Sequence, residues 1–178
     1  RESAVPYAVR PARETDVSQL TAIEKEAFPT TWPPTPFKRE LSNRIASFLV
    51  AYETPGNGQF GSLAAQEAPR ARGDGATHRL RRLWRRLLRR KDPAPLPADS
   101  PERVVGYVAT WYMTDEAHIT GIAVRESLRG NGLGELLLIA SIEMAMRRQS
   151  RVVTLEVRAS NQVAQSLYTK YGFSQVGL

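Results

Sequence analysis

The chain has 178 residues, of which 42% are hydrophobic and 24% charged, and its formal net charge is +7. This length suits one domain with its own core. The absence of cysteine and the presence of only two histidines exclude a disulfide framework and a cysteine nucleophile, and no metal site is expected. No apolar run reaches the roughly 20 residues of a membrane helix. No signal peptide is recognisable, so a cytoplasmic protein is expected.

The positive charge is concentrated in one segment. Residues 70–91 contain ten of the 25 basic residues and one of the 18 acidic ones, which leaves 15 basic and 17 acidic residues elsewhere. Basic residues therefore do not form the broad footprint of a nucleic-acid-binding domain.

The N-terminal third predicts two strands and two helices. A strand is expected at residues 7–10, followed by a helix at 16–28 for which Asp16 is the expected cap. Four prolines interrupt the chain after this helix, and a second helix is expected at 36–43. The apolar stretch at 47–53 indicates a buried strand.

Residues 55–102 differ from the rest of the chain, since Gly, Pro, Ala and Arg dominate there without a strand pattern. We expect a long basic insertion between the second and third strands. Within it, residues 78–91 place leucines and Trp84 at helical spacing among arginines, which predicts a basic amphipathic helix. Three interpretations remain open: docking to ribosomal RNA or an anionic membrane surface, packing on the domain, or packing against a second copy.

Regular patterns return after the insertion. Two strands at 103–113 and 117–125, joined by a tight turn, predict an antiparallel pair. A helix at 132–149, a strand at 152–157 and a helix capped by Asn161 follow. This order predicts an α/β fold in which a mixed sheet is flanked by helices.

Three glycines alternate just before the helix at 132–149, namely Gly130, Gly132 and Gly134. The third glycine comes one residue too early for a dinucleotide-binding fingerprint, and no Lys-Ser/Thr pair follows as in a P-loop. Alternate glycines before a helix N-terminus still suit a pyrophosphate, because main-chain N–H groups can converge there. A strand-to-helix turn that merely requires glycine explains the loop equally well.

Residues beyond the loop carry a family resemblance. The stretch RGNGLG at 129–134, preceded by GIAV and followed by LEVRASNQVAQSLYTKYGF, resembles the GNAT-superfamily N-acetyltransferases and in particular the RimI-type ribosomal-protein alanine N-acetyltransferases. The segment EAFPTTWPPTPFKREL resembles the N-terminal part of the same branch. The resemblance implies a single N-acetyltransferase domain over residues 1–178 with the GNAT fold, apart from the insertion.

The resemblance also implies a binding site for acetyl-CoA. Main-chain groups of one strand would pair with the pantetheine arm, and the glycine loop would bind the pyrophosphate. The strand residues implied are Ile122, Ala123 and Val124, and the loop residues are Arg129, Gly130, Asn131, Gly132, Leu133, Gly134 and Glu135. Asn161 would contact the cofactor near its reactive end.

Two residues are candidates for proton transfer. Amide formation requires a deprotonated amine, and an α-amino group has a pKa of about 8, so a nearby carboxylate can remove the proton. Glu156 lies between apolar residues of a predicted strand, and the resemblance favours it as the base over a solvated surface glutamate. Tyr168 is the implied acid for the leaving thiolate, although its helical position also fits a core tyrosine. We interpret His118 as structural.

The implied function is transfer of acetyl from acetyl-CoA to a protein N-terminus, with the N-terminal alanine of a ribosomal protein as the expected acceptor. Alternatives are acetylation of a small-molecule amine or a lysine, and a non-catalytic acetyl-CoA-binding module that acts through the basic helix. Family members continue beyond YGF with two strands that complete the acceptor site, whereas this chain ends at Leu178. We therefore expect those strands to be missing from it.

Overall fold

The computed structural model describes residues 7–30, 33–54 and 102–177. Nearly all of the insertion, including the basic helix expected at 78–91, lies outside the described residues. Within the described part of the chain, no helix is long and apolar enough to cross a membrane.

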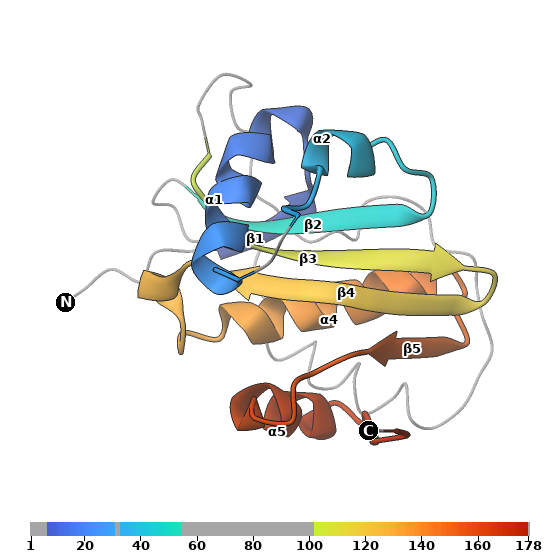
Figure 1. Ribbon diagram of the computed structural model, residues 1–178. Coiled ribbons are helices and arrows are strands. Elements are labelled where there is room, and N and C mark those ends of the chain that lie inside the picture. Colours follow the sequence, from blue (N-terminus) through green and yellow to red (C-terminus); the bar gives the residue numbers. More distant parts are fainter. Residues whose placement is uncertain (1–6, 31–32, 55–101, 178) are drawn as a thin grey trace.

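A five-stranded sheet forms the centre of the domain, and its strands follow one another in chain order (Figure 1). Neighbours are antiparallel from β1 to β4, whereas β5 is parallel to β4. The strands are β1 (Tyr7–Pro11), β2 (Ala46–Glu53), β3 (Val104–Met113), β4 (Glu116–Val124) and β5 (Val152–Leu155). The mixed sheet predicted from the sequence is thus confirmed, including the tight turn between β3 and β4.

Helices cover both faces of the sheet (Figure 1). The 3-10 turns are η1 (Glu14–Asp16) and η2 (Glu126–Leu128), and the helices are α1 (Val17–Ala27), α2 (Phe37–Glu40), α4 (Leu133–Arg147) and α5 (Gln162–Lys170). Helix α4 connects β4 to the parallel strand β5, as a parallel pair requires. Helix α2 is shorter than the sequence predicts and continues as turns.

The core has two layers, one on each side of the sheet. Residues of α1 and α2 pack with Phe48, Tyr107 and Ala123 on one face, which we call the α1 face. Residues of α4 pack with Val108 and Ile119 on the other, the α4 face, and α5 adds partly buried side chains there. Side chains of β4 therefore lie on both faces: Ala123 packs on the α1 face and Ile119 on the α4 face.

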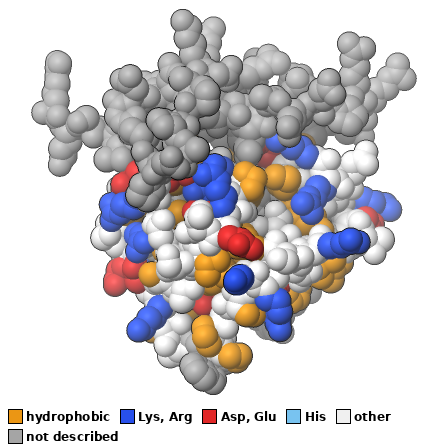
Figure 2. All heavy atoms as spheres, turned by 90° about the horizontal axis from the view of Figure 1, so that it is seen from above, with side chains coloured by type: hydrophobic (Ala, Val, Ile, Leu, Met, Phe, Trp, Pro, Cys, Tyr) orange, Lys and Arg blue, Asp and Glu red, His pale blue; other side chains and the backbone are white. Residues whose placement is uncertain are grey.

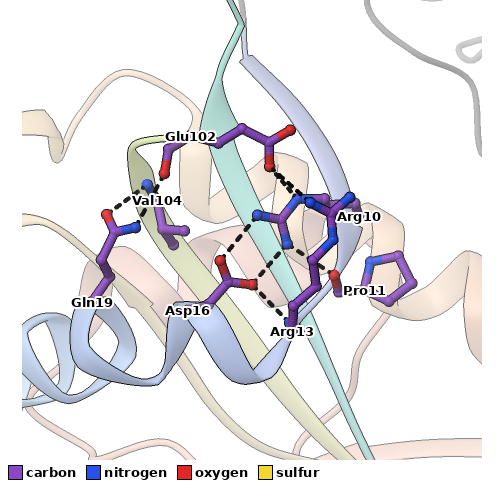
Figure 3. Close-up of polar contacts among 7 residues, drawn as sticks. All are labelled: Arg10, Pro11, Arg13, Asp16, Gln19, Glu102 and Val104. Carbon is purple, nitrogen blue, oxygen red and sulfur yellow. Dashed lines mark hydrogen bonds and ion pairs between the residues drawn. The ribbon is translucent and has the colours of Figure 1, made fainter. Parts of the chain in front are cut away.

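Asp16 does not act as the predicted cap of α1, whose N-terminus has no side-chain cap. Its carboxylate instead accepts hydrogen bonds from the Arg10 guanidinium at 2.7 and 3.0 Å and from the Arg13 N–H at 2.7 Å (Figure 3). Glu102 binds Arg10 from the opposite side at 2.5 Å. Burial alone would raise the pKa of Asp16, but the hydrogen bonds from Arg10 and Arg13 lower it. The network joins β1 and η1 to the beginning of β3, a pairing that local sequence could not reveal.

The two ends of the segment at 55–101 lie next to each other on β2 and β3. Glu53 donates its N–H to the Arg103 carbonyl at 3.0 Å, and their side chains form an ion pair at 2.8 Å. The segment therefore begins and ends on adjacent antiparallel strands, where a hairpin turn would otherwise stand.

Basic side chains are spread among apolar ones on the surface that Figure 2 shows, which views the molecule from above the orientation of Figure 1. Within the described residues drawn there, they do not merge into one continuous patch.

Candidate functional site

Strands β4 and β5 pair over only part of their length. The pairing runs from Glu116 with Val152 to Ile119 with Leu155 and then stops, while β4 continues to Val124. We call the point where the two strands separate the β4–β5 fork. Beyond it, β3 is the only strand of the described residues that pairs with β4. A parallel strand that splays from its neighbour in this way leaves main-chain groups available to an extended ligand.

The direction of those main-chain groups follows from strand alternation. Arg125 donates its N–H to the Val105 carbonyl on β3 at 2.9 Å, so Ala123, two residues earlier, also directs its groups toward β3. The carbonyl oxygen of Ala123 accordingly lies against Gly106. A Cβ added to Gly106 would be only 2.7 Å from this oxygen. Ile122 and Val124 then direct theirs to the free edge. The strand contact expected of three residues is reduced to these two, because the main chain of Ala123 already faces β3.

The glycine loop begins directly after η2 and leads into α4. Gly130 and Gly132 have φ of 79° and 78°, in the left-handed region that suits glycine. Gly132 is the N-cap of α4, and no side chain caps this helix. The first three N–H groups of α4, those of Leu133, Gly134 and Glu135, have no carbonyl partner within the helix. The loop is exposed and can present these donors to an anion.

Gly134 separates the two interpretations of the loop. Backbone conformation explains glycine at positions 130 and 132, but Gly134 lies in the first turn of α4 without a positive φ. A Cβ placed there would meet nothing within 4 Å. Alanine would stabilise a helix position of this kind by about 0.5–1 kcal/mol. Neither the turn nor packing among the described residues requires this glycine.

Arg129 and Asn131 bond mainly to the loop's own surroundings. The Arg129 guanidinium donates to the Val124 carbonyl at 3.4 Å and to the Glu26 carbonyl at 3.3 Å. The Asn131 amide donates to the Leu128 and Arg129 carbonyls at 3.1 and 3.3 Å. Asn131 therefore stabilises the turn, and Arg129 adds positive charge beside it. Leu133 is buried and offers the site only its main chain.

Glu26 and Arg125 connect the loop to α1. Arg125 binds Glu26 at 3.0 Å, and Glu26 also accepts the Glu126 N–H at 3.1 Å. Sequence reasoning did not identify Arg125, because its partner lies 99 positions away.

Glu135 bonds within the protein rather than standing free for a ligand. Lys170 donates to its carboxylate at 2.6 Å, and the Tyr171 hydroxyl donates to the same oxygen. The bonds from Lys170 and Tyr171 lower the pKa of Glu135. Burial and the bond to Glu135 raise the pKa of Tyr171 to about 12. These contacts attach the end of α5 to the first turn of α4, so the glycine loop is positioned partly by α5.

Asn161 is the N-cap of α5, as predicted. Its side-chain oxygen accepts the Ala164 N–H at 3.1 Å, and the residue is exposed. The side-chain amide nitrogen is not used in that bond and can donate to a ligand.

Glu156 does not lie in the middle of a strand, because β5 ends at Leu155. Its side chain is exposed, one position beyond the β4–β5 fork. The predicted strand was too long because the apolar residues of 152–157 are not all paired with β4. Glu156 is thus beside the fork but within reach of solvent.

Tyr168 extends from α5 toward the α4 face. Its half-buried ring packs with Phe173 at 5.8 Å between ring centroids and contacts the α4-side core together with Leu155. Burial raises the pKa of the phenol, so the hydroxyl keeps its proton at neutral pH. The two candidate proton-transfer residues therefore belong to different elements, since Glu156 follows β5 and Tyr168 lies on α5.

These features define a class of protein: an α/β domain in which the edge of β4 separates from β5 and a glycine-rich loop leads into the helix that follows β4. The sequence profile of the acetyltransferase (GNAT) family matches residues 59–173. The chain belongs to this family, which confirms the resemblance inferred from the RGNGLG loop.

Two relatives illustrate the similarity in sequence. An N-alpha-acetyltransferase of Sulfurisphaera tokodaii is 30% identical over 172 residues, which cover 96% of this chain and 81% of that protein. A [ribosomal protein bS18]-alanine N-acetyltransferase of Salmonella typhimurium is 35% identical over 80 residues, 45% of this chain and 54% of that protein. The chain thus matches about half the length of such bacterial relatives.

Solved structures share the fold. The ribosomal-protein-S18-alanine N-acetyltransferase from Escherichia coli superimposes with a TM-score of 0.60 at 21% identity, covering 96% of this chain and 79% of that one. Aminoglycoside N-acetyltransferase AAC(6')-Iy in complex with CoA has a TM-score of 0.63 at 12% identity, covering 100% and 94%.

Proposed function

We propose that this chain binds acetyl-CoA and transfers the acetyl group to the α-amino group of a protein N-terminus, with the N-terminal alanine of a ribosomal protein as the acceptor. The observation that carries the cofactor part is Gly134, a glycine that neither backbone conformation nor packing among the described residues requires. The relatives' names support the acceptor, and the CoA complex of a protein with the same fold supports the cofactor.

The binding mode follows from the free main-chain groups. The pyrophosphate would lie over the N–H groups of Gly132 to Glu135, where the positive end of the α4 dipole favours negative charge. The pantetheine arm would run along the free edge of β4 and pair with Ile122 and Val124 as an added strand does. This directs the thioester toward the β4–β5 fork.

The proposed reaction is direct attack, since the chain has no cysteine that could carry an acetyl group. The amine nitrogen forms a bond to the thioester carbonyl carbon, and the carbon–sulfur bond breaks. Glu156 accepts a proton from the amine, and the Tyr168 hydroxyl gives its proton to the departing thiolate. Tyr168 suits that role because it stays protonated at neutral pH.

Gly134→Ala tests the cofactor part, because the two explanations of the loop predict opposite consequences. If a ligand approaches here, the variant melts at a slightly higher temperature than the parent but binds acetyl-CoA at least tenfold more weakly by calorimetry. Gly172→Ala is the control, since that glycine has φ of 86° and lies outside the loop. Unchanged acetyl-CoA affinity in Gly134→Ala would contradict the proposal.

Thiol release from acetyl-CoA with Ala-initiated peptides tests the acceptor part. The N-acetylated form of each peptide is the matched blank, because it lacks a reactive amine. We expect release with the free N-terminus only. Release with lysine side chains or aminoglycosides in place of the peptide would favour the alternative acceptors, and acetyl-CoA binding without any release would favour a non-catalytic module.

A further inference from the structure

A carboxylate stands in the first turn of the helix whose N–H groups would bind the pyrophosphate. Glu135 is the third residue of α4 after its N-cap Gly132, and it is the acidic residue of that turn. Side chains of an α-helix lean toward its N-terminus, so the Glu135 carboxylate extends toward the same end of α4 that an anion would approach. The positive end of the helix dipole attracts both groups, while their negative charges repel each other.

Two residues at the end of α5 hold this carboxylate. Nζ of Lys170 donates to Oε1 of Glu135 at 2.6 Å, and the Tyr171 hydroxyl donates to the same oxygen. These bonds lower the pKa of Glu135, so its carboxylate is charged at neutral pH. We call Glu135, Lys170 and Tyr171 the Glu135 cluster. It carries one negative and one positive charge, and therefore no net charge, beside the glycine loop.

The ammonium group of Lys170 can make further hydrogen bonds. A lysine ammonium group has three donors, and among the described residues only Glu135 accepts one of them. The Lys170 side chain is 58% exposed and that of Glu135 is 31% exposed. The main-chain N–H of Glu135 is one of the free donors at the start of α4. Because the Glu135 side chain holds Nζ, a phosphate group bound at those donors would be close enough to attract the ammonium group.

Attachment of α5 to the domain does not by itself require these charges. Side chains of α5 and of the turn after it, including Leu167, Tyr168 and Phe173, already pack against the core on the α4 face. An ion pair as exposed as that of Glu135 and Lys170 adds little to stability. Beside a bound anion, in contrast, the two charges act with opposite signs on the affinity of the ligand.

Opposed charges at this position have a use in a cycle of binding and release. Acetyl-CoA and the product CoA carry the same pyrophosphate, so any group that retains one of them there also retains the other. Product release limits the turnover of many enzymes. A carboxylate beside the pyrophosphate lowers the affinity for both forms, and an ammonium group next to that carboxylate limits the loss.

We propose that Glu135 and Lys170 set the affinity of this domain for the pyrophosphate of CoA with opposite signs, so that Glu135 promotes release and Lys170 retains the ligand. The inference rests on the proposed function, because it takes the glycine loop as the pyrophosphate site. Tyr171 contributes by holding Oε1 of Glu135 next to Lys170.

Calorimetric titration of the whole protein with CoA tests the two signs. Glu135→Gln removes the negative charge but keeps the main-chain N–H, so it should bind CoA about 3- to 10-fold more tightly than the parent. Lys170→Gln leaves the carboxylate without its partner charge and should bind CoA about 3- to 10-fold more weakly. The double variant should return close to the parental affinity, because the cluster again has no net charge.

Lys38→Gln is the matched control. It makes the same change in charge, but Lys38 lies on α2, which packs on the α1 face of the sheet, so CoA affinity should stay at the parental value. Added salt should reduce the differences that Glu135→Gln and Lys170→Gln cause, because exposed charges are screened. Thermal melting without ligand checks that each variant is folded at the temperature of the titration.

Two smaller probes identify the part of the ligand that responds. Dephospho-CoA lacks the 3′-phosphate but retains the pyrophosphate, so the opposite shifts in affinity should persist with it. Pantetheine has no phosphate, so its affinity, measured by NMR titration, should be the same in the parent and in both variants. Dissociation of CoA, followed by displacement with excess unlabelled ligand, should be slower in Glu135→Gln and faster in Lys170→Gln.

Three kinds of result would overturn the inference. Weaker CoA binding in Glu135→Gln, as in Lys170→Gln, would mean that the cluster only attaches α5 to α4. Parental affinity in both variants would mean that neither charge acts on the ligand. Shifts that also occur with pantetheine, or that vanish with dephospho-CoA, would place the effect away from the pyrophosphate.

Failure of the proposed function gives a different pattern. Absence of CoA binding by the parent protein would overturn that function and this inference together. A parent that binds CoA but transfers no acetyl group would count only against the transfer reaction, and the signs of the two variants would still decide the inference.

Discussion

The two ends of the candidate site are built from different kinds of groups. At the glycine loop and the free edge of β4, the available groups belong to the main chain, and short stretches of sequence determine where they point. Near the β4–β5 fork, the candidate groups are the side chains of Glu156, which follows β5, and of Tyr168 on α5. Main-chain sites are therefore tolerant of most substitutions except those at glycine, whereas the fork depends on individual functional groups.

Glu156→Gln is expected to have the largest effect and to separate the two ends most clearly. The change preserves shape but removes the proton-accepting carboxylate, so kcat should fall by about 10²- to 10⁴-fold. Acetyl-CoA affinity should stay near the parental value, because the side chain is exposed and bonds to no group of the loop. Steady-state kinetics and calorimetry measure the two quantities. An equal loss of both would mean that Glu156 supports the structure.

Tyr168→Phe should have the second-largest effect on kcat. The ring keeps its packing against Phe173, so the fold should be unaffected, but the leaving thiolate loses its proton donor. We expect a loss in kcat of about 10²-fold, at the low end for general acid catalysis. Because the thiolate of CoA can also be protonated by water, a substrate with a more acidic thiol should be less affected. A parental kcat with acetyl-CoA would remove Tyr168 from the mechanism.

Gly132→Val tests the main-chain end. A β-branched residue is strained at φ of 78°, so it would shift the N-cap of α4 and with it the N–H groups that open the helix. Losing one or two hydrogen bonds to a charged ligand should weaken acetyl-CoA binding by about 100-fold.

Gly172→Val is the matched control, because that position has φ of 86° and similarly open surroundings. Both variants should lose comparable stability, but only Gly132→Val should lose cofactor affinity. Equal affinities would mean that the glycines serve only the turn.

Glu135→Gln should have the smallest effect, and its size should depend on pH. Hydrogen bonds from Lys170 and then Tyr171 lower the pKa of Glu135. A lowered carboxyl pKa stabilises the fold above the unfolded value of about 4.3, and this contribution is lost as the pH falls through the lower, folded value.

For this partly exposed cluster we expect about 1 kcal/mol at neutral pH, a decrease in Tm of about 2–4 °C. The difference between parent and variant should shrink below about pH 4. Calorimetric melting of parent and variant at neutral pH and below about pH 4 measures this difference in Tm. A difference that stays constant, or grows in acid, would show that the carboxylate charge is not responsible.

The sequence predicted the parts that depend on local patterns. Alternation of apolar residues predicted the strands, and the RGNGLG loop together with the residues around it predicted the family. It failed where a residue's partner is distant. Asp16 looked like a helix cap, but Arg10 and Glu102 recruit it into another network. The bond between Glu135 and Tyr171, 36 positions away, was likewise not predicted.

The same limit applies to two further residues. Glu156 was expected within a strand, because an apolar pattern cannot indicate where β5 leaves β4. The hydrogen bond between His118 and Thr154 was not predicted, since nothing near His118 in the sequence points to a residue 36 positions later. The register between β4 and β5 creates that contact.

The adjacent ends of the segment at 55–101 also have a consequence for how this domain tolerates change. Glu53 and Arg103 bond to each other across β2 and β3, so the sheet closes independently of what connects them. The entropic cost of a connecting loop rises by only about 0.6 kcal/mol for each doubling of its length. The junction is therefore a permissive site for insertions, where an engineer could add a reporter domain.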